Sequence, residues 1–107
     1  MDRHAQIDVF SQAAHRLAVI RLREKPARLV EALGVIERWR QTPATVSHCA
    51  PYLDEWEALL RGGVDAVELA ACATTDHGAT LRSVSPLGRF ITAAERSDLL
   101  KQARQAA

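Results

Sequence analysis

The side chains able to do chemistry are few and scattered along the chain. His48 directly precedes Cys49, a pairing that could serve a metal ion or place a nucleophile beside its base. A metal site would need further ligands at a recognised spacing, and a nucleophile would need a third group to orient the base. The sequence offers neither. Further candidates for catalysis, again without a spacing that demands chemistry, are His15, Cys72, Asp76 and His77. We therefore expect no enzymatic activity, no metal site and no cofactor.

Arg82 and Arg89 are the more informative polar pair, because they flank the short stretch 85–88. Each guanidinium could bind both oxygens of a carboxylate or phosphate on a partner, which a lysine would do less well. The alternative is an internal tie, in which either arginine pairs with Asp76, with Glu95 or with the C-terminus of a helix. The sequence predicts a partner-binding role for both arginines and leaves the internal tie open.

The composition is that of one ordinary domain spanning residues 1–107. The 14 Lys and Arg against 13 Asp and Glu leave a net charge of +1, too little to attract nucleic acid or an acidic membrane. Cys49 and Cys72 do not make a disulfide framework and are interpreted as small apolar residues. The N-terminal residues lack the apolar core of a signal peptide, and no stretch approaches the roughly 20 apolar residues of a membrane span. We expect a cytoplasmic protein without membrane contacts.

The clearest helical pattern lies in residues 51–63, PYLDEWEALLRGG, which are predicted to form the centre of the core. Apolar residues recur there at steps of three and four, and they are Tyr52, Leu53, Trp56, Leu59 and Leu60. Pro51 suits the first turn of a helix, and the pair of glycines suits its end. Trp39 and Trp56 are expected in or beside one core.

Residues 2–25 are predicted to form one long helix, because apolar residues recur at helical spacing without Gly or Pro. Their apolar stripe is broader than one neighbouring helix would cover. One row consists of Ile7, Phe10, Ala14 and Leu17, and the flanking row consists of Val9, Ala13 and Ile20. Either this helix is central, or the flanking row binds a homodimer mate or another protein.

A second helix is predicted over residues 26–40, with Pro26 in its first turn, so that the two helices make a hairpin. Gly34 lies in its middle, where the usual compensation is the close approach of a neighbouring helix. Residues 41–50 show no period and are predicted to be a loop.

The chain after the glycine pair carries a second helix-start pattern. Asp65 and Glu68 have the spacing of a capping box, with Val64 and Leu69 as its hydrophobic staple. A short helix over residues 66–73 that buries Leu69 is predicted.

The remaining C-terminal segments are predicted to be short helices separated by turns. Residues 74–76 are polar caps for a short helix that Gly78 weakens. Residues 85–88 hold a proline and a glycine and are predicted to turn, and residues 92–95, TAAE, are a capping box that starts the last helix. The chain is thus predicted to be all-α, a small bundle of about five or six helices with a long N-terminal helix hairpin and shorter C-terminal helices.

Several short motifs follow one another in an order that resembles a known group. They are AAHRLAVIRLREKP, IERW, PYLDEWEALL and LRSVSPLGRFITAAER. This order resembles an uncharacterised group of small helical bacterial proteins with R-W, P-Y-x-x-W-x-x-L-L and L-R-x-x-S-P-x-x-G patterns. Leu87 stands where that group tends to have phenylalanine, and residues 75–78 replace a more acidic stretch. Genes of the group often lie beside genes for nucleotidyltransferase-like proteins of the toxin–antitoxin or abortive-infection kind, so the resemblance implies an accessory or antitoxin-like protein that acts by binding.

These observations favour a protein-binding function over two alternatives. The first alternative is a helical nucleic-acid-binding regulator. Its basic surface would consist either of Arg82 and Arg89 beside the 85–88 turn, or of Arg16, Arg21, Arg23, Lys25 and Arg28. A proline at the start of the second helix fits poorly with a helix-turn-helix reader. The second alternative is a small enzyme, for which no motif speaks. A homo-oligomeric helical protein with the same apolar stripe remains within the protein-binding interpretation.

Overall fold

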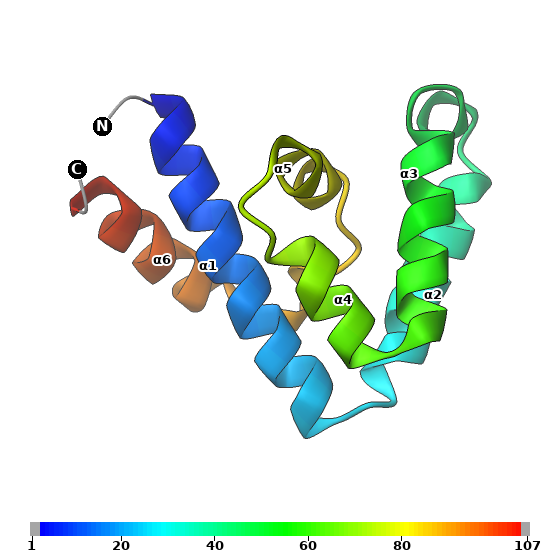
Figure 1. The fold of residues 1–107 in the computed structure, drawn as a ribbon, viewed down its shortest axis with the longest axis horizontal. Coiled ribbons are helices and arrows are strands. Elements are labelled where there is room, and N and C mark those ends of the chain that lie inside the picture. The colour runs from blue at the N-terminus through cyan, green and yellow to red at the C-terminus, as the bar shows by residue number, and fades with distance from the viewer. Residues whose placement is uncertain (1–2, 106–107) are drawn as a thin grey trace.

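The computed structural model describes residues 3–105, apart from the side chains of residues 45–47. Within that range the chain is all-α, as the sequence predicts (Figure 1). Its elements are α1 (Arg3–Glu24), α2 (Arg28–Arg40), α3 (Pro43–Gly62), α4 (Val64–Ala71), α5 (Asp76–Ser83), the 3-10 turn η1 (Gly88–Phe90) and α6 (Ala93–Gln105). None of the described helices combines the length and apolar character needed to span a membrane.

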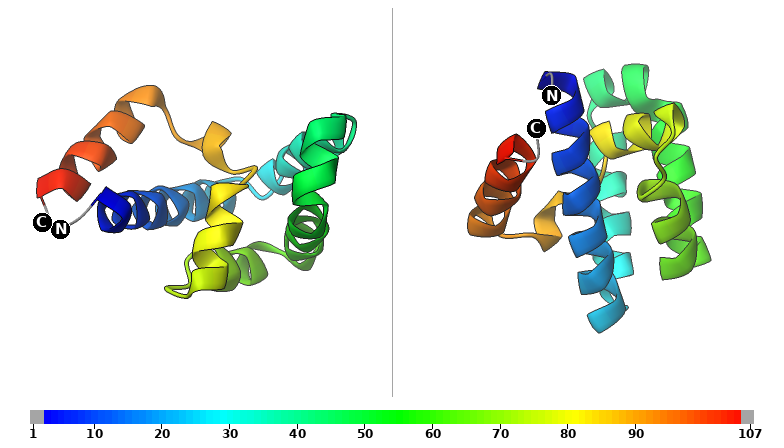
Figure 2. Two further views of the ribbon diagram at one scale, coloured as in Figure 1. Left: turned by 90° about the horizontal axis from the view of Figure 1, so that it is seen from above. Right: turned by 60° about the vertical axis from the view of Figure 1, so that its left-hand side comes forward.

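The long helix α1 is central, because α4, α5, α6 and η1 all pack against it. Figure 2 shows α6 on the side of α1 that faces away from α2 and α3. The predicted helix over residues 2–25 is confirmed from Arg3 to Glu24, and its expected start at residue 2 lies outside the described residues. Side chains of α1 that point into the core include Ala18, Val19 and Leu22, each at most 2% exposed.

The core is built around α3, where the predicted apolar face is confirmed. Leu53 and Trp56 are fully buried and Leu60 is 2% exposed. The indole nitrogen of Trp56 donates a hydrogen bond of 3.0 Å to the Leu81 carbonyl, which joins α3 to α5. Trp39 is half-buried beside the same cluster, so both tryptophans belong to one core.

The start of α3 differs from the prediction. The helix begins at Pro43, directly after the extended residue Thr42, so the expected loop over residues 41–50 is mostly helix. Pro43 occupies the first turn, where its missing N–H leaves no hydrogen bond unmade. Pro51, predicted to open the helix, lies inside it and is exposed. The helix continues through Pro51 and loses one backbone hydrogen bond there.

The second helix begins at Arg28, two residues after the predicted Pro26, because residues 25–27 form a tight turn closed by a 2.9 Å bond from the Arg28 N–H to the Lys25 carbonyl. α2 packs most extensively along α3 and only lightly against α1, so the hairpin of α1 and α2 is open (Figure 1). The close approach expected at Gly34 is absent. The nearest atom to a Cβ at Gly34 would be Nη1 of Arg38, 3.8 Å away on the same helix.

The predicted capping box before α4 is wrong. Gly63, with φ of +103°, allows α3 to end and α4 to begin at Val64 without a loop. Asp65 makes no cap, because its carboxylate accepts a hydrogen bond from Arg23 on α1 at 2.8 Å, and Glu68 does the same at 3.0 Å. Leu69, predicted to be buried, is 81% exposed.

The C-terminal caps are confirmed. Thr75 accepts a hydrogen bond of 3.0 Å from the Gly78 N–H and starts α5. At α6, the Thr92 N–H donates to Glu95 at 2.9 Å and the Glu95 N–H donates to the Thr92 hydroxyl at 3.1 Å. Residues 85–88 turn as predicted and lead into η1.

Candidate functional site

Arg82, predicted to face a partner, lies inside the protein. Arg82 is only 7% exposed. Its Nη1 donates hydrogen bonds to the carbonyl oxygens of Ala71 at 3.0 Å and Ala73 at 2.6 Å. Since α4 ends at Ala71, the guanidinium covers carbonyls that lack a partner within the helix and sits at the negative end of its dipole. The structure therefore places Arg82 in the internal tie to a helix C-terminus, and not on a binding surface.

Arg89, the other half of the predicted pair, behaves differently. It belongs to η1 and is exposed. Arg82 is therefore buried within the fold, whereas Arg89 lies on the surface.

The predicted stripe on α1 is positioned as expected for a surface row. Val9 is 38% exposed and Ile20 is 51% exposed, with the half-buried Ala13 between them. These side chains lie on the side of α1 opposite Ala18 and Leu22.

The cysteines and the remaining histidines do not converge on a reactive centre. His48 is exposed and Cys49 is half-buried, and Nε2 of His77 lies 2.6 Å from a carboxylate oxygen of Glu55 at the surface. Burial raises the pKa of the Cys72 thiol, which makes it less reactive. Within the described part of the chain, no cluster of three His, Cys, Asp or Glu side chains could hold a metal ion.

The N-terminal basic residues are largely engaged within the fold. Arg21 donates to both carboxylate oxygens of Glu95 and to the Phe90 carbonyl. Arg23 binds the acidic side chains at the start of α4, and Arg28 donates to the Arg21 carbonyl at 2.8 Å. These contacts hold arginine side chains within the fold, whereas a nucleic-acid-binding surface would need them free to contact phosphates.

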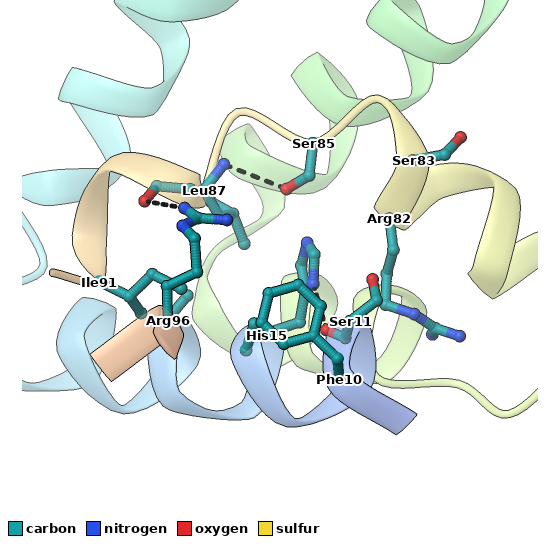
Figure 3. Close-up of a pocket in the computed structure, with 12 residues that line it drawn as sticks. Phe10, Ser11, His15, Arg82, Ser83, Ser85, Leu87, Ile91 and Arg96 are labelled. Carbon is teal, nitrogen blue, oxygen red and sulfur yellow. Dashed lines mark hydrogen bonds between the residues drawn. The ribbon is translucent and has the colours of Figure 1, made fainter. Parts of the chain in front are cut away.

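A pocket of about 190 Å³ opens between α1, α5 and the segment from residue 85 to α6 (Figure 3). Figure 3 shows His15 of α1 in its centre, with Arg82 to one side and Arg96 of α6 to the other. Its apolar walls include Phe10 and Ile91.

His15 is held in one orientation at the base of this pocket. It is 8% exposed, its Nδ1 lies 2.7 Å from the Ser11 carbonyl, and its ring stacks on Trp56 with centroids 6.5 Å apart. Because a carbonyl only accepts hydrogen bonds, Nδ1 must carry the proton. Burial lowers the pKa of His15, opposed by the bond to Ser11 and assisted by the charge of Arg82, so the ring is neutral at pH 7.

Two buried polar atoms of the pocket residues make no hydrogen bond among the described residues: Nε2 of His15, an acceptor, and Nε of Arg82, a donor. The sequence does not predict that His15 and Arg82 line the same pocket, because the two residues are far apart in the chain. The only available signal was a histidine set in an otherwise apolar part of α1.

Comparisons with known proteins give no relative to set beside this geometry. No protein-family model, curated protein or solved structure matches the chain.

Proposed function

We propose that this protein is a non-enzymatic, protein-binding accessory protein whose contact surface is the outward face of α1. The observation that carries the proposal is the exposure of Val9 and Ile20 on a helix whose opposite side is buried from Ala14 to Leu22. The elements α4, α5, α6 and η1 all pack against α1, so the exposure is not due to a shortage of neighbouring elements.

The face has the shape that a second helix requires. Val9 and Ile20 stand at its two ends, and the small Ala13 between them permits close approach of another backbone. Arg16 is exposed on the same face, between Ala13 and Ile20, and its charged head would need a polar or acidic group on the partner. Exposed apolar side chains that share one face of a helix are a feature of interaction sites.

Two partners fit the face, and the experiment distinguishes them. A second copy of the chain would pair α1 with α1, and a net charge of +1 opposes such pairing little. In the antitoxin-like role implied by the sequence resemblance, the partner is a nucleotidyltransferase-like protein, and binding covers a surface of that enzyme.

The test measures assembly directly. Sedimentation equilibrium over a wide concentration range shows whether the chain dimerises, and co-purification with the product of any neighbouring nucleotidyltransferase-like gene tests the second partner. An Ile20→Ser variant should weaken whichever complex forms by at least tenfold, since it removes the most exposed large apolar side chain of this face.

The matched control is Val30→Ser, which changes another exposed β-branched residue, 70% exposed, on α2. Val30→Ser should leave assembly unchanged. A chain that stays monomeric and binds no such partner, or an equal effect of both variants, would show that α1 is not the contact surface.

A further inference from the structure

We propose that the pocket around His15 and Arg82 binds a small hydroxy acid, a carboxylate that carries a hydroxyl group on a short hydrocarbon body. This site is independent of the α1 contact surface, because its lining residues come from the inner side of α1, from α5 and from residues 85–96. The inference rests on two unpaired buried polar atoms, on the charge of the lining and on the size and character of the walls.

The charge of the lining selects an anion. Arg82 and Arg96 both line the pocket, and no Asp or Glu of the described chain does. Among the described residues the Arg82 guanidinium forms no ion pair, and it contacts carbonyls at the C-terminus of α4, which offers about half an elementary charge. A buried cation compensated so incompletely favours an anionic ligand. Nε of Arg82, which has no hydrogen-bond partner in residues 3–105, is free to donate to a carboxylate oxygen.

His15 adds the requirement for a donor. With the proton fixed on Nδ1 by the Ser11 carbonyl, Nε2 can only accept. It is buried and unpaired among the described atoms, and such an acceptor gains most from a ligand O–H. A simple carboxylate has no such donor, whereas a hydroxy acid presents the carboxylate and the hydroxyl together.

The walls set the size of the ligand. A volume of about 190 Å³ corresponds to roughly six water molecules in the liquid, so the site holds a molecule of about six to eight non-hydrogen atoms. Phe10, Ala14, Leu87 and Ile91 contribute apolar surface, which favours a short hydrocarbon chain over a fully hydrated inorganic ion.

Isothermal titration calorimetry at pH 7 with five probes tests each part of the proposal. The probes are the separate enantiomers of 2-hydroxybutyrate, butyrate, 1,2-butanediol and inorganic phosphate. One enantiomer of 2-hydroxybutyrate should bind with a dissociation constant on the order of 1 mM or tighter. Butyrate should bind about three- to tenfold more weakly, as expected for the loss of one hydrogen bond, and the uncharged diol should not bind.

Matched variants locate the binding in this pocket. Arg96→Ala should weaken 2-hydroxybutyrate several-fold, whereas Arg89→Ala should not, because Arg89 is an exposed arginine of the neighbouring η1 that does not line the pocket. His15→Phe keeps an aromatic ring against Trp56 and removes the acceptor, so 2-hydroxybutyrate and butyrate should then bind equally.

Nuclear magnetic resonance of the imidazole nitrogens gives a readout that does not depend on any variant. Binding should shift the Nε2 resonance of His15 and leave Nδ1 protonated. Absence of saturable binding would overturn the proposal. Phosphate binding as tightly as 2-hydroxybutyrate, or equal binding of butyrate to the wild-type protein, would overturn the assignment of a hydroxy acid.

Discussion

Gly34 and Gly78 are both helical glycines, yet their surroundings are opposite. A Cβ at Gly34 would meet only a side-chain nitrogen at 3.8 Å, an ordinary contact. A Cβ at Gly78 would lie 2.5 Å from the Ala73 carbonyl oxygen, which belongs to the backbone and cannot swing away. Gly78, which looks in the sequence like a weak point of α5, is therefore required by the packing of α5 on the end of α4.

Replacing each glycine by alanine should change stability in opposite directions. Gly34→Ala should raise the free energy of unfolding by about 0.5–1 kcal/mol, because alanine restricts the unfolded chain and favours the helix. Gly78→Ala should lower it by about 1–3 kcal/mol through the forced backbone shift. Urea unfolding followed by circular dichroism measures both changes, and effects of the same sign would contradict the assigned surroundings.

The two arginines beside the 85–88 turn should also separate under mutation. Arg82→Ala leaves the carbonyls of Ala71 and Ala73 without their donor, so it should lower the free energy of unfolding by about 1–3 kcal/mol. Arg89→Ala, at an exposed position, should change stability by less than about 0.5 kcal/mol. Thermal melting of the two single variants provides the comparison. A wild-type melting temperature for Arg82→Ala would show that α4 does not depend on this cap.

At the scale of elements, Glu95 fixes the start of α6 and ties it to α1. Its carboxylate accepts hydrogen bonds from Arg21 and from the Thr92 N–H, and together these lower the pKa of Glu95 from 4.5 to about 2. The folded protein thus keeps this carboxylate ionised at pH values where the unfolded chain takes up a proton.

The stability that Glu95 contributes should be lost as the pH falls from about 4.5 towards 2. The contribution is fully present above the ordinary pKa of the carboxyl group and is lost as the pH approaches the lowered one. A Glu95→Gln variant should lose much of this pH dependence, which chemical denaturation at a series of pH values would measure. Parallel curves for wild type and variant would mean that the contact with Arg21 is not maintained in solution.

The stability of the protein should be most sensitive to truncation of the buried side chains of α3. Trp56→Ala removes a fully buried indole and leaves the Leu81 carbonyl without its donor, so it should cost about 3–5 kcal/mol. Denaturant unfolding measures the loss. Melting like that of the wild type would remove α3 from the centre of the core.

Elements whose boundaries depend on local chemistry could be predicted from the sequence, and others could not. Thr92 and Glu95 cap α6 with their own neighbours, so the pattern was sufficient. Asp65 and Glu68 have the same spacing, but Arg23, more than 40 residues away, takes both side chains. Likewise Pro43 and Pro51 are equally good first-turn residues, and only the packing of α3 decides between them.

The candidate sites divide in the same way. The membership of the row on α1 follows from periodicity, whereas its exposure depends on where the other helices pack. The pocket depends on bringing His15, Arg82 and Arg96 together from three helices, which no spacing in the sequence encodes. The same is true of the cap that Arg82 provides, since it depends on where α4 ends.

For the whole molecule, α6 is the least integrated helix, because it packs chiefly against α1 on the side away from α3 (Figure 2). Its amides should exchange with solvent through a local opening, whereas those around Trp56 in α3 should require global unfolding. Arg21→Gln should accelerate exchange in α6 selectively, because it removes the ties to Glu95 and Phe90.

Hydrogen exchange followed by mass spectrometry measures this difference. The control is Arg61→Gln, which removes only a surface pair of α3 with Glu57 and should leave α6 unchanged. Equal acceleration throughout the protein would show that α6 does not open as a separate unit.

The stacking of His15 on Trp56 gives the protein an internal optical probe. A protonated imidazole quenches indole fluorescence more strongly than a neutral one, and the ring of His15 stacks beside that of Trp56 with centroids 6.5 Å apart and planes 28° from parallel. In a Trp39→Phe background, emission should come from this one indole and should dim on acidification with a midpoint below pH 6.5, since burial lowers the pKa of His15. The same emission would follow any molecule that reaches Nε2, so the pocket can be titrated by light without a label.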